Sequence, residues 1–251
     1  MRGMELKGKA ALVTGGARRI GREIALGLAR AGADVAITYL ASQKQAQQTL
    51  VDLAGFGVRA LALRCDVREA KSARAAVKDV VREFGGLDIL VNNAALYETV
   101  AWEKLTAEQW DSMFAANTRG PFLVTQAATA ALRQRRGRVI NLGSLGGMRP
   151  WPSHAHYCAS KAAVTMLTQV MARALAPQVA VNCVAPGMIE TGDSKRQSAA
   201  HKAYMRKIAA KTPMGRAGTP AEVAAAVLFF AAAPEFITGQ VLVVDGGLGL
   251  S

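Results

Sequence analysis

Hydrophobic residues follow two alternating patterns along this chain. Short continuous apolar runs are typical of strands buried on both faces of a sheet, and longer segments with apolar residues every three or four positions are typical of helices. The runs predict seven strands, at 10–13, 34–39, 59–65, 88–91, 138–142, 179–184 and 240–244. The periodic segments predict helices near 20–32, 42–55, 71–84, 106–133, 157–176, 194–211 and 220–232.

Strand and helix alternate from one end of the chain to the other. This order predicts an α/β fold, a Rossmann-like doubly wound parallel sheet with helices on both faces. No linker or repeat interrupts residues 1–251, so we expect a single dinucleotide-binding and catalytic domain. The irregular region at about 187–218 holds a segment, 194–211, with six Lys or Arg residues and no acid. A solvated helix would explain this segment, but its place in the fold favours a mobile lid over a substrate pocket.

The amino-acid composition and net charge limit the kinds of molecule that the protein is expected to bind. Apolar residues make up 51% and charged residues 20%, as in a globular protein, and the net charge is +13. Nucleic acid, a membrane surface or an anionic small molecule could each use that charge. The basic residues are scattered, and neither a basic tail nor zinc-finger spacing occurs. We therefore expect a phosphate-rich ligand and a solvated basic surface, with no nucleic-acid partner and no metal site.

The cysteines and the apolar runs indicate the cellular compartment in which the protein is expected. Three cysteines without a CxxC pair, Cys65, Cys158 and Cys183, are typical of free thiols in a reducing compartment. The first residues lack the apolar core of a signal peptide, and the longest apolar run, 223–233, is too short to span a bilayer. We expect a soluble, cytoplasmic protein that does not enter membranes.

The turn at 14–21, Thr-Gly-Gly-Ala-Arg-Arg-Ile-Gly, joins the first strand to the first helix. Glycines let the backbone approach a pyrophosphate, and a helix N-terminus offers free N–H groups and a positive dipole end. Arg19 stands where the usual dinucleotide fingerprint has its middle glycine. The residues of this turn expected to bind a cofactor are Gly15, Arg18, Arg19, Ile20 and Gly21.

The end of the second strand indicates which dinucleotide is bound. In many dinucleotide-binding proteins an acidic residue there holds the ribose 2′-hydroxyl, but this strand ends Ile-Thr-Tyr-Leu at 37–40 without a carboxylate. A 2′-phosphate would instead meet Arg18 and the hydroxyl of Ser42. The sequence therefore predicts NADPH/NADP rather than NADH, although two arginines could also merely solvate a turn.

Tyr157 and Lys161 are four residues apart at the start of a predicted helix, so their side chains share one face. A free tyrosine, with a pKa of roughly 10, is a poor acid–base catalyst at neutral pH, and a neighbouring ammonium should lower that pKa. Ser144 follows the fifth strand, at the carboxyl edge where open α/β sheets build their sites.

Together these features resemble the short-chain dehydrogenase/reductase family over nearly the whole chain. The motifs that carry the resemblance are, in chain order, the turn at 14–21, Cys65-Asp66-Val67, Asn92-Asn93-Ala94, Asn117, Ser144, Tyr157 with Lys161, Asn182, Pro186-Gly187 and Val244-Asp245-Gly246-Gly247. The resemblance implies a sheet of strand order 3-2-1-4-5-6-7 and a homotetramer.

The resemblance also implies roles for individual residues. Tyr157 would be the general acid in reduction, and Lys161 would lower its pKa and hold the nicotinamide ribose. Ser144 would orient the reacting group of the substrate, and Asn117 would sit at a helix kink and hold a proton-relay water. The further cofactor contacts implied are Asp66 and Val67 at the adenine, Asn93 at its ribose, and Pro186, Gly187, Met188 and Thr191 around the nicotinamide and its phosphate.

Two departures from the common family pattern resemble its pteridine reductase branch. They are Arg19 in place of glycine, and Tyr97 after the Asn-Asn-Ala motif, where the branch has an aromatic residue that would stack on a pterin. We therefore expect a pterin substrate of the dihydropteridine or dihydrofolate kind.

The alternatives are a 3-oxoacyl-carrier-protein reductase or another ketone reductase. Ser144, where some pteridine reductases have Asp, and the basic lid suit them. A non-catalytic NADPH-sensing regulator would be expected to lack Tyr157 or Lys161, and both are present.

Overall fold

Seven strands form one parallel sheet of order β3-β2-β1-β4-β5-β6-β7, which confirms the predicted fold class. The computed structural model describes residues 5–191 and 199–250. The strands are β1 Ala10–Val13, β2 Asp34–Tyr39, β3 Ala60–Arg64, β4 Ile89–Asn92, β5 Arg138–Leu142, β6 Ala180–Pro186 and β7 Val241–Val244. The central strands are buried on both faces, which is why they read as continuous apolar runs.

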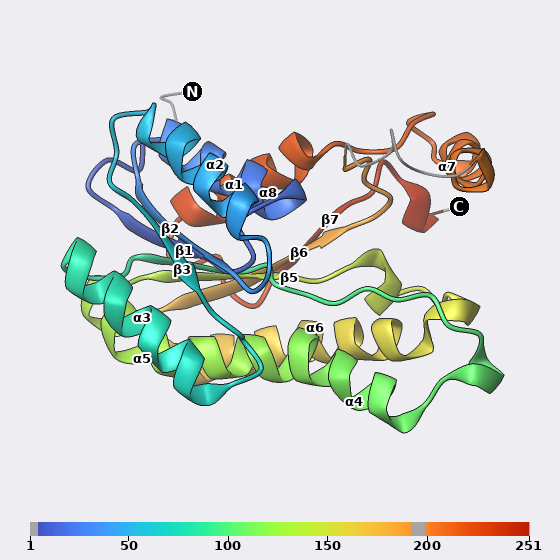
Figure 1. Ribbon diagram of the computed structural model, residues 1–251, viewed down its shortest axis with the longest axis horizontal. Coiled ribbons are helices and arrows are strands. Elements are labelled where there is room, and N and C mark those ends of the chain that lie inside the picture. Colours follow the sequence, from blue (N-terminus) through green and yellow to red (C-terminus); the bar gives the residue numbers. More distant parts are fainter. Residues whose placement is uncertain (1–4, 192–198, 251) are drawn as a thin grey trace.

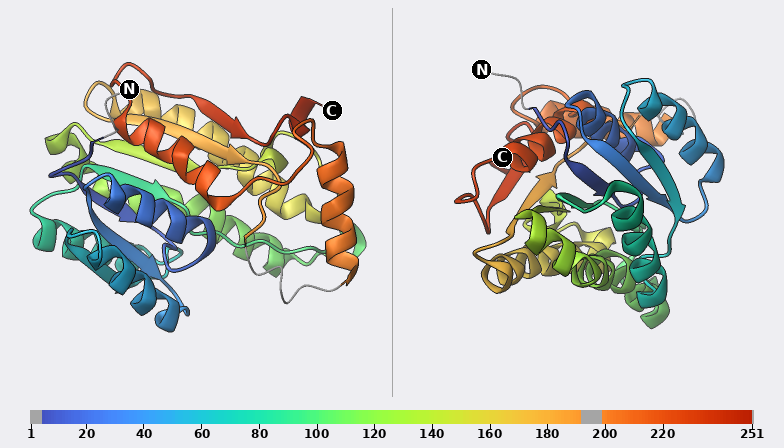
Figure 2. Two further views of the ribbon diagram at one scale, coloured as in Figure 1. Left: turned by 90° about the horizontal axis from the view of Figure 1, so that it is seen from above. Right: turned by 90° about the vertical axis from the view of Figure 1, so that its left-hand side faces the viewer.

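Helices cover both faces of the sheet (Figure 1). One layer holds α1 Arg19–Arg30, α2 Gln43–Ala54 and α8 Pro220–Ala232, and the other holds α3 Ala70–Phe84, α4 Ala107–Phe114, α5 Gly120–Arg135 and α6 Ala155–Leu175. The end-on view in Figure 2 shows the twisted sheet between these layers, with one hydrophobic cluster on each face. In the described parts of the chain, no helix is both long and apolar enough to cross a bilayer.

Local sequence signals set where several helices begin. Thr219 caps α8 in a reciprocal capping box with Glu222, and Pro220 occupies the first turn, where its missing N–H costs nothing. Thr106 and Gln109 form the same arrangement at the start of α4. Each cap fixes the residue at which a helix begins, after a loop that borders the carboxyl edge of the sheet.

The single helix predicted at 106–133 is interrupted. A π-helical segment, Ala115–Arg119, separates α4 from α5 and contains Asn117. Pro121 explains the break, because a proline inside a helix has no N–H to donate to the carbonyl four residues earlier. The wider turn is the helix irregularity that was expected at Asn117.

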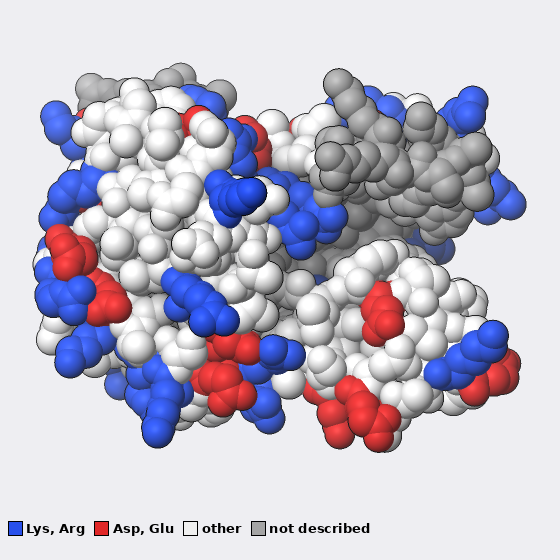
Figure 3. Space-filling view, viewed as in Figure 1, with Lys and Arg blue, Asp and Glu red and all other residues white. Residues whose placement is uncertain are grey.

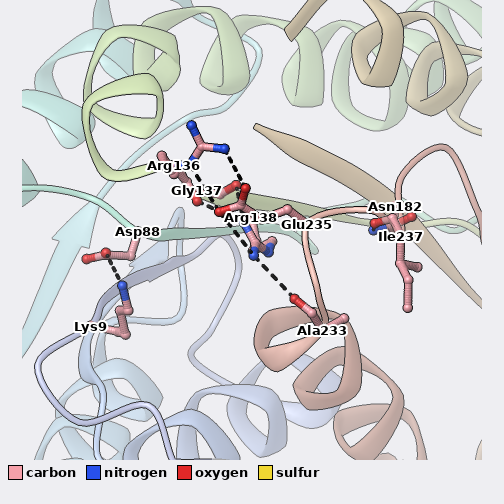
Figure 4. Close-up of polar contacts among 9 residues, drawn as sticks. All are labelled: Lys9, Asp88, Arg136, Gly137, Arg138, Asn182, Ala233, Glu235 and Ile237. Carbon is pink, nitrogen blue, oxygen red and sulfur yellow. Dashed lines mark hydrogen bonds and ion pairs between the residues drawn. The ribbon is translucent and has the colours of Figure 1, made fainter. Parts of the chain in front are cut away.

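Ion pairs and buried polar contacts tie the amino end of the sheet together (Figure 4). Asp88 is 5% exposed and accepts hydrogen bonds from the backbone N–H of Ala10 at 3.0 Å and from Lys9 Nζ at 3.1 Å. The guanidinium of Arg138 donates to the carbonyl of Ala233 at 3.2 Å, so it links β5 to the end of α8. These contacts lie at the opposite end of the strands from the glycine-rich turn at 14–21.

Candidate active site

A cavity of about 760 Å³ follows the carboxyl edge of the sheet. Figure 3 shows the molecule hollowed on this face, with Lys and Arg side chains bordering the hollow. Besides Thr191, sixteen of the predicted site residues line the cavity: Gly15, Arg18, Arg19, Ile20, Gly21, Ser42, Asp66, Val67, Asn93, Tyr97, Ser144, Tyr157, Lys161, Pro186, Gly187 and Met188. Asn117 does not line it.

The glycines of the turn at 14–21 are required by close backbone packing. Gly15 has a φ of +65°, and a Cβ there would lie 3.0 Å from Ala94 Cα. A Cβ on Gly21 would collide with the carbonyl oxygen of Gly15 and with Asn93 Nδ2. No side chain caps the N-terminus of α1, and its first turn holds no acid. The turn therefore fits a bound phosphate group, which would meet backbone N–H groups and the positive end of the helix dipole.

Arg19 adopts a left-handed backbone conformation, with a φ of +52°. Such a conformation costs a residue with a side chain about 1–2 kcal/mol, and glycine avoids most of that cost. The chain thus keeps the glycine-like shape of the fingerprint turn while placing an exposed guanidinium beside the cavity. An outlier of this kind at a ligand site indicates that the side chain has a use there.

Positive and neutral groups surround the end of the cavity near β2 and β3. β2 ends at Tyr39 without a carboxylate, and Ser42 precedes α2 without making a capping hydrogen bond. The carboxylate of Asp66 is held by Arg68, with an Nη2 to Oδ2 distance of 2.6 Å. This pairing holds the pKa of Asp66 below its usual value and offsets its charge.

Arg68 is a cavity residue that the sequence analysis missed. Its spacing from Asp66, two residues further along a loop, was the available signal. The guanidinium stands beside the region where the resemblance places the adenine, and Asp66 balances its charge.

Asn93 shapes the turn from the end of β4. Its side-chain amide donates to the carbonyl oxygens of Thr14 at 2.9 Å and Gly15 at 3.1 Å. Its backbone N–H donates to Thr14 Oγ1 at 3.0 Å. These bonds fix the turn against β4, so Asn93 supports the shape of the cavity. The ribose contact expected from the resemblance stays a prediction.

Ser144, Tyr157 and Lys161 lie together at the other end of the cavity. Lys161 is 4% exposed, and its Nζ donates to the carbonyl oxygen of Leu142 at 2.7 Å. That Nζ lies 5.9 Å from the centroid of the Tyr157 ring. Ser144 Oγ accepts from the N–H of Gly146 at 3.0 Å, which fixes the side chain at the end of β5.

The pKa values of the pair differ from expectation. Tyr157 is partly exposed as a whole residue, yet burial of its phenol raises its pKa to about 12, with a hydrogen bond to Ser144 acting in the opposite direction. Burial also lowers the pKa of Lys161 to about 8. The net shift of the Tyr157 pKa is therefore opposite to the predicted one, because desolvation of the phenolate outweighs the groups that favour the charged form.

Asn117 lies behind the cavity and connects two of its walls. Its Nδ2 donates to the carbonyl oxygen of Leu96 and to Ser160 Oγ, both at 3.0 Å, and its Oδ1 accepts from the N–H of Leu96 at 2.7 Å. Ser160 Oγ in turn donates to the carbonyl oxygen of Tyr157 at 2.8 Å. Asn117 thereby joins the loop that carries Tyr97 to the helix that carries Tyr157.

Aromatic side chains border the cavity beside the tyrosine. The ring of Tyr97 meets that of Tyr157 edge-on, with centroids 4.9 Å apart. Trp151, which the sequence analysis did not select, also lines the cavity, and its ring lies 6.3 Å from that of Tyr157. Its position six residues before Tyr157 was the only signal, and that spacing alone specifies no role.

The irregular region predicted at 187–218 flanks this end of the cavity. Ile189 pairs with Gly218 in an isolated parallel bridge that closes the base of the region. Helix α7, Ala199–Lys211, follows, and Met188 and Met205 line the cavity. Residues 192–198, which include part of the expected helix, lie outside the described residues.

Comparisons with known proteins agree with this geometry. A family model described as Enoyl-(Acyl carrier protein) reductase matches residues 15–249. A 3-oxoacyl-(acyl-carrier-protein) reductase of Staphylococcus aureus is 38% identical over 96% of this chain and 98% of its own length. The corresponding reductase of Vibrio cholerae is 39% identical over 98% of this chain and 99% of its own.

A solved structure shows that the fold is also shared with a known protein. A dehydrogenase/reductase from Sinorhizobium meliloti is 37% identical and superposes with a TM-score of 0.90 over 98% of this chain and 96% of its own. Both the sequence motifs and the arrangement of the seven strands are thus shared with characterised folds. The chain belongs to the short-chain dehydrogenase/reductase family of oxidoreductases.

Proposed function

We propose that this protein is an NADPH-dependent reductase that converts a ketone to a secondary alcohol. The observation that carries the proposal is that Tyr157, Ser144 and Lys161 line the same end of the cavity, with Lys161 Nζ 5.9 Å from the centroid of the Tyr157 ring. A protonated phenol is the form needed to donate a proton to a carbonyl oxygen during reduction.

The residues around the cavity fit a dinucleotide. The glycine turn at 14–21 and the N-terminus of α1 would hold the pyrophosphate, and Lys161 and the segment from Pro186 to Met188 would border the nicotinamide end. Arg18, Arg19 and Ser42, together with the absence of an acid in the described end of β2, favour a 2′-phosphate and hence NADPH. When bound, the nicotinamide supplies a hydride to the carbonyl carbon.

The chain's own residues supply the rest of the chemistry. Ser144 Oγ would hydrogen-bond the carbonyl oxygen and orient it toward Tyr157. Tyr157 would give its hydroxyl proton to that oxygen as the carbon is reduced. The ammonium of Lys161, whose pKa of about 8 leaves it charged at neutral pH, would stabilise the phenolate that remains until a proton returns.

The named relatives support a ketone substrate better than a pterin. Both are 3-oxoacyl-(acyl-carrier-protein) reductases, so the preferred pterin interpretation of the sequence loses to its alternative. The exposed basic residues of α7, Arg206, Lys207 and Lys211, are also suited to an acidic carrier. The pterin interpretation retains one structural argument, which is that Arg19 and Tyr97 both line the cavity.

The test is the loss of NADPH absorbance with a 3-oxoacyl thioester or with dihydrobiopterin, each repeated with NADH. We expect turnover of the thioester with NADPH, slower turnover with NADH, and none of the pterin. Tyr157→Phe, which removes only the donated hydroxyl, serves as the matched inactive control. Turnover of the pterin alone would overturn the ketone proposal and restore the one based on Arg19 and Tyr97.

We further propose a homotetramer. Two exposed apolar surfaces support it, one on the helices α5 and α6 and one at the edge strand β7. The exposed side chains are Phe122, Met166 and Val170 on the first surface, and Phe236, Leu242 and Val243 on the second. Two self-complementary surfaces on one chain produce a closed tetramer, so light scattering should give the mass of four 26.4 kDa chains.

The region at 187–218 is proposed to act as a lid, because its α7 stands beyond the end of the sheet and Met188 and Met205 reach the cavity. The three free cysteines, Cys65, Cys158 and Cys183, suit a reducing compartment, so we propose a cytoplasmic location.

A further inference from the structure

Two aromatic rings lie beside the ring of Tyr157 and form two walls of the cavity. The plane of Trp151 is within 9° of that of Tyr157, whereas Tyr97 stands at 87° to it, with its centroid 4.9 Å away. Trp151 and Tyr97 therefore present ring surfaces in two nearly perpendicular directions around the proton donor. Both side chains line the cavity.

Neighbouring residues hold these two rings in place. The ring of Trp151 lies against the backbone of Gly146, where an added Cβ would come within 3.0 Å of it. Tyr97 stacks on His154 with centroids 5.0 Å apart, and a hydrogen bond of 2.9 Å connects that histidine to Thr99. The walls are thus organised without a ligand, which lowers the entropy lost when a rigid ligand binds.

Lys161, whose Nζ bonds to Leu142, and Glu190 of the 187–218 region also line the cavity, and the other side chains named at this end are neutral. Met188 and Met205 line the cavity from the 187–218 region, and thioethers make favourable contacts with aromatic rings. Ser144 and the protonated Tyr157 are uncharged. Six of the lining side chains carry no charge that would bind a substrate carboxylate or phosphate, namely Ser144, Tyr157, Tyr97, Trp151, Met188 and Met205.

We propose that the preferred substrate carries a flat aromatic ring directly on its ketone carbon, and that Trp151 determines this specificity. The inference rests on the proposed ketone reduction and names its substrate class. With the carbonyl oxygen at Ser144 and Tyr157, the adjoining ring lies against Trp151 and Tyr97. Aromatic contacts are favourable beyond the area that they bury, and a rigid aryl ketone loses less freedom on binding than an alkyl chain does.

The test compares two 3-oxopropanoyl thioesters of N-acetylcysteamine that carry phenyl or cyclohexyl at the ketone carbon. The two groups are similar in size, and only phenyl is flat and aromatic. We expect wild-type protein to prefer phenyl about tenfold in kcat/KM, as two aromatic contacts of modest strength would give. Trp151→Ala should bring the phenyl-to-cyclohexyl ratio close to one, and Trp151→Phe should retain most of the preference.

Trp102→Ala is the matched control, because Trp102 is 69% exposed and lies outside the cavity. It should leave the ratio unchanged. Tyr97→Leu provides an independent variant if Trp151→Ala fails to fold, and it should lower the ratio severalfold. Equal wild-type rates for the two ketones, or a ratio that neither Trp151→Ala nor Tyr97→Leu changes, would overturn the aromatic proposal. Absence of turnover with every ketone would instead overturn the proposed function.

Discussion

At the scale of single residues, the chain retains costly arrangements where it would bind and react. Arg19 holds a left-handed backbone, Lys161 is buried, and the phenol of Tyr157 has its pKa raised by burial. Strained or desolvated groups persist only where the surrounding structure determines them, and they concentrate at functional sites. Each of the three gives a prediction. Arg19 should affect stability and cofactor binding in opposite directions, Tyr157 should affect turnover without cofactor binding, and Lys161 should determine the pH dependence of reduction.

Arg19→Gly should separate stability from cofactor binding. Glycine relieves the left-handed strain but adds freedom to the unfolded chain, so the free energy of unfolding should rise by about 0.5–1 kcal/mol. Loss of the guanidinium should weaken NADPH binding by about 1–2 kcal/mol. Urea unfolding and calorimetric titration measure the two effects.

Arg18→Ala is the comparison for that variant. It should weaken NADPH far more than NADH, by about 1–3 kcal/mol, without a gain in stability. An unchanged ratio of the two affinities would remove Arg18 from the 2′-phosphate site.

Tyr157→Phe should abolish turnover and leave NADPH binding nearly intact. The substitution removes the proton donor but keeps the ring that packs near Trp151 and Tyr97. Steady-state rates and NADPH fluorescence titration measure the two effects. Full activity in the variant would exclude the tyrosine mechanism.

The pH dependence of kcat/KM should reflect the titration of Lys161 rather than that of Tyr157. Reduction needs a protonated phenol, which is available up to a pKa of about 12, and a charged Lys161, whose lowered pKa is about 8. Since the ammonium is lost as pH rises through the lower value, kcat/KM should fall above about pH 8. If kcat/KM stays constant across that pH, the charge of Lys161 makes no contribution to reduction.

Sequence alone could single out Tyr157 and Lys161 as candidates, because their spacing places both side chains on one face of a helix. It could not identify Trp151 or Arg68, since each acquires its place from a loop whose path depends on tertiary packing. The direction of the Tyr157 pKa was misjudged for a related reason. Sequence spacing brings a lysine near, but burial is a property of the folded chain.

At the scale of elements, the π-helical segment between α4 and α5 connects helix geometry to the cavity. The apolar periodicity predicted one helix there, because it continues through the segment, and only the family resemblance placed a kink at Asn117. The strands were predicted within a few residues, since their apolar runs reflect burial on both faces. The ends of β6 differ most, as the strand continues to Pro186.

Asn117→Ala should release the loop before Tyr97. The substitution removes both hydrogen bonds between the Asn117 amide and the Leu96 backbone. Hydrogen exchange at the Leu96 amide should become at least about tenfold faster, as loss of about 1.4 kcal/mol of protection would produce. Ser160→Ala removes the bonds of Ser160 Oγ to Asn117 and to the Tyr157 carbonyl but neither bond to Leu96, so it should leave that protection in place. Equal protection of Leu96 in wild type and Asn117→Ala would show that other contacts hold the loop.

At the scale of the whole molecule, the two ends of one parallel sheet have different roles, one in stability and one in forming the cavity. Contacts at its amino end connect strands and helices that are distant in sequence, and the cavity occupies its carboxyl edge. The overall fold was predictable because strand and helix alternate, and the strand order followed from the family resemblance. Of the aromatic lining, Tyr97 was predicted from the family resemblance and Trp151 was not, because Trp151 reaches the cavity from a loop whose path depends on tertiary packing.

Asp88→Ala should destabilise the protein without altering its chemistry. It leaves the buried N–H of Ala10 without an acceptor, so the free energy of unfolding should fall by about 1–3 kcal/mol. Asp88→Asn retains an acceptor and should lose less. Urea denaturation measures the loss, and kcat/KM below the transition should stay at its wild-type value. A large fall in kcat/KM would show that the two ends of the sheet are coupled.

The separation of these two ends has a consequence for laboratory evolution. Loops at the carboxyl edge can be diversified while the amino-end contacts of Asp88 and Arg138 keep their stabilising role. Variant libraries centred on Trp151, Tyr97, Met188 and Met205 should therefore yield many folded clones with altered substrate ranges. Libraries of the same size at the amino end should yield mainly losses of expression. Distant substitutions at the two ends should combine additively, so stabilising changes at one end can be selected first and new substrates afterwards.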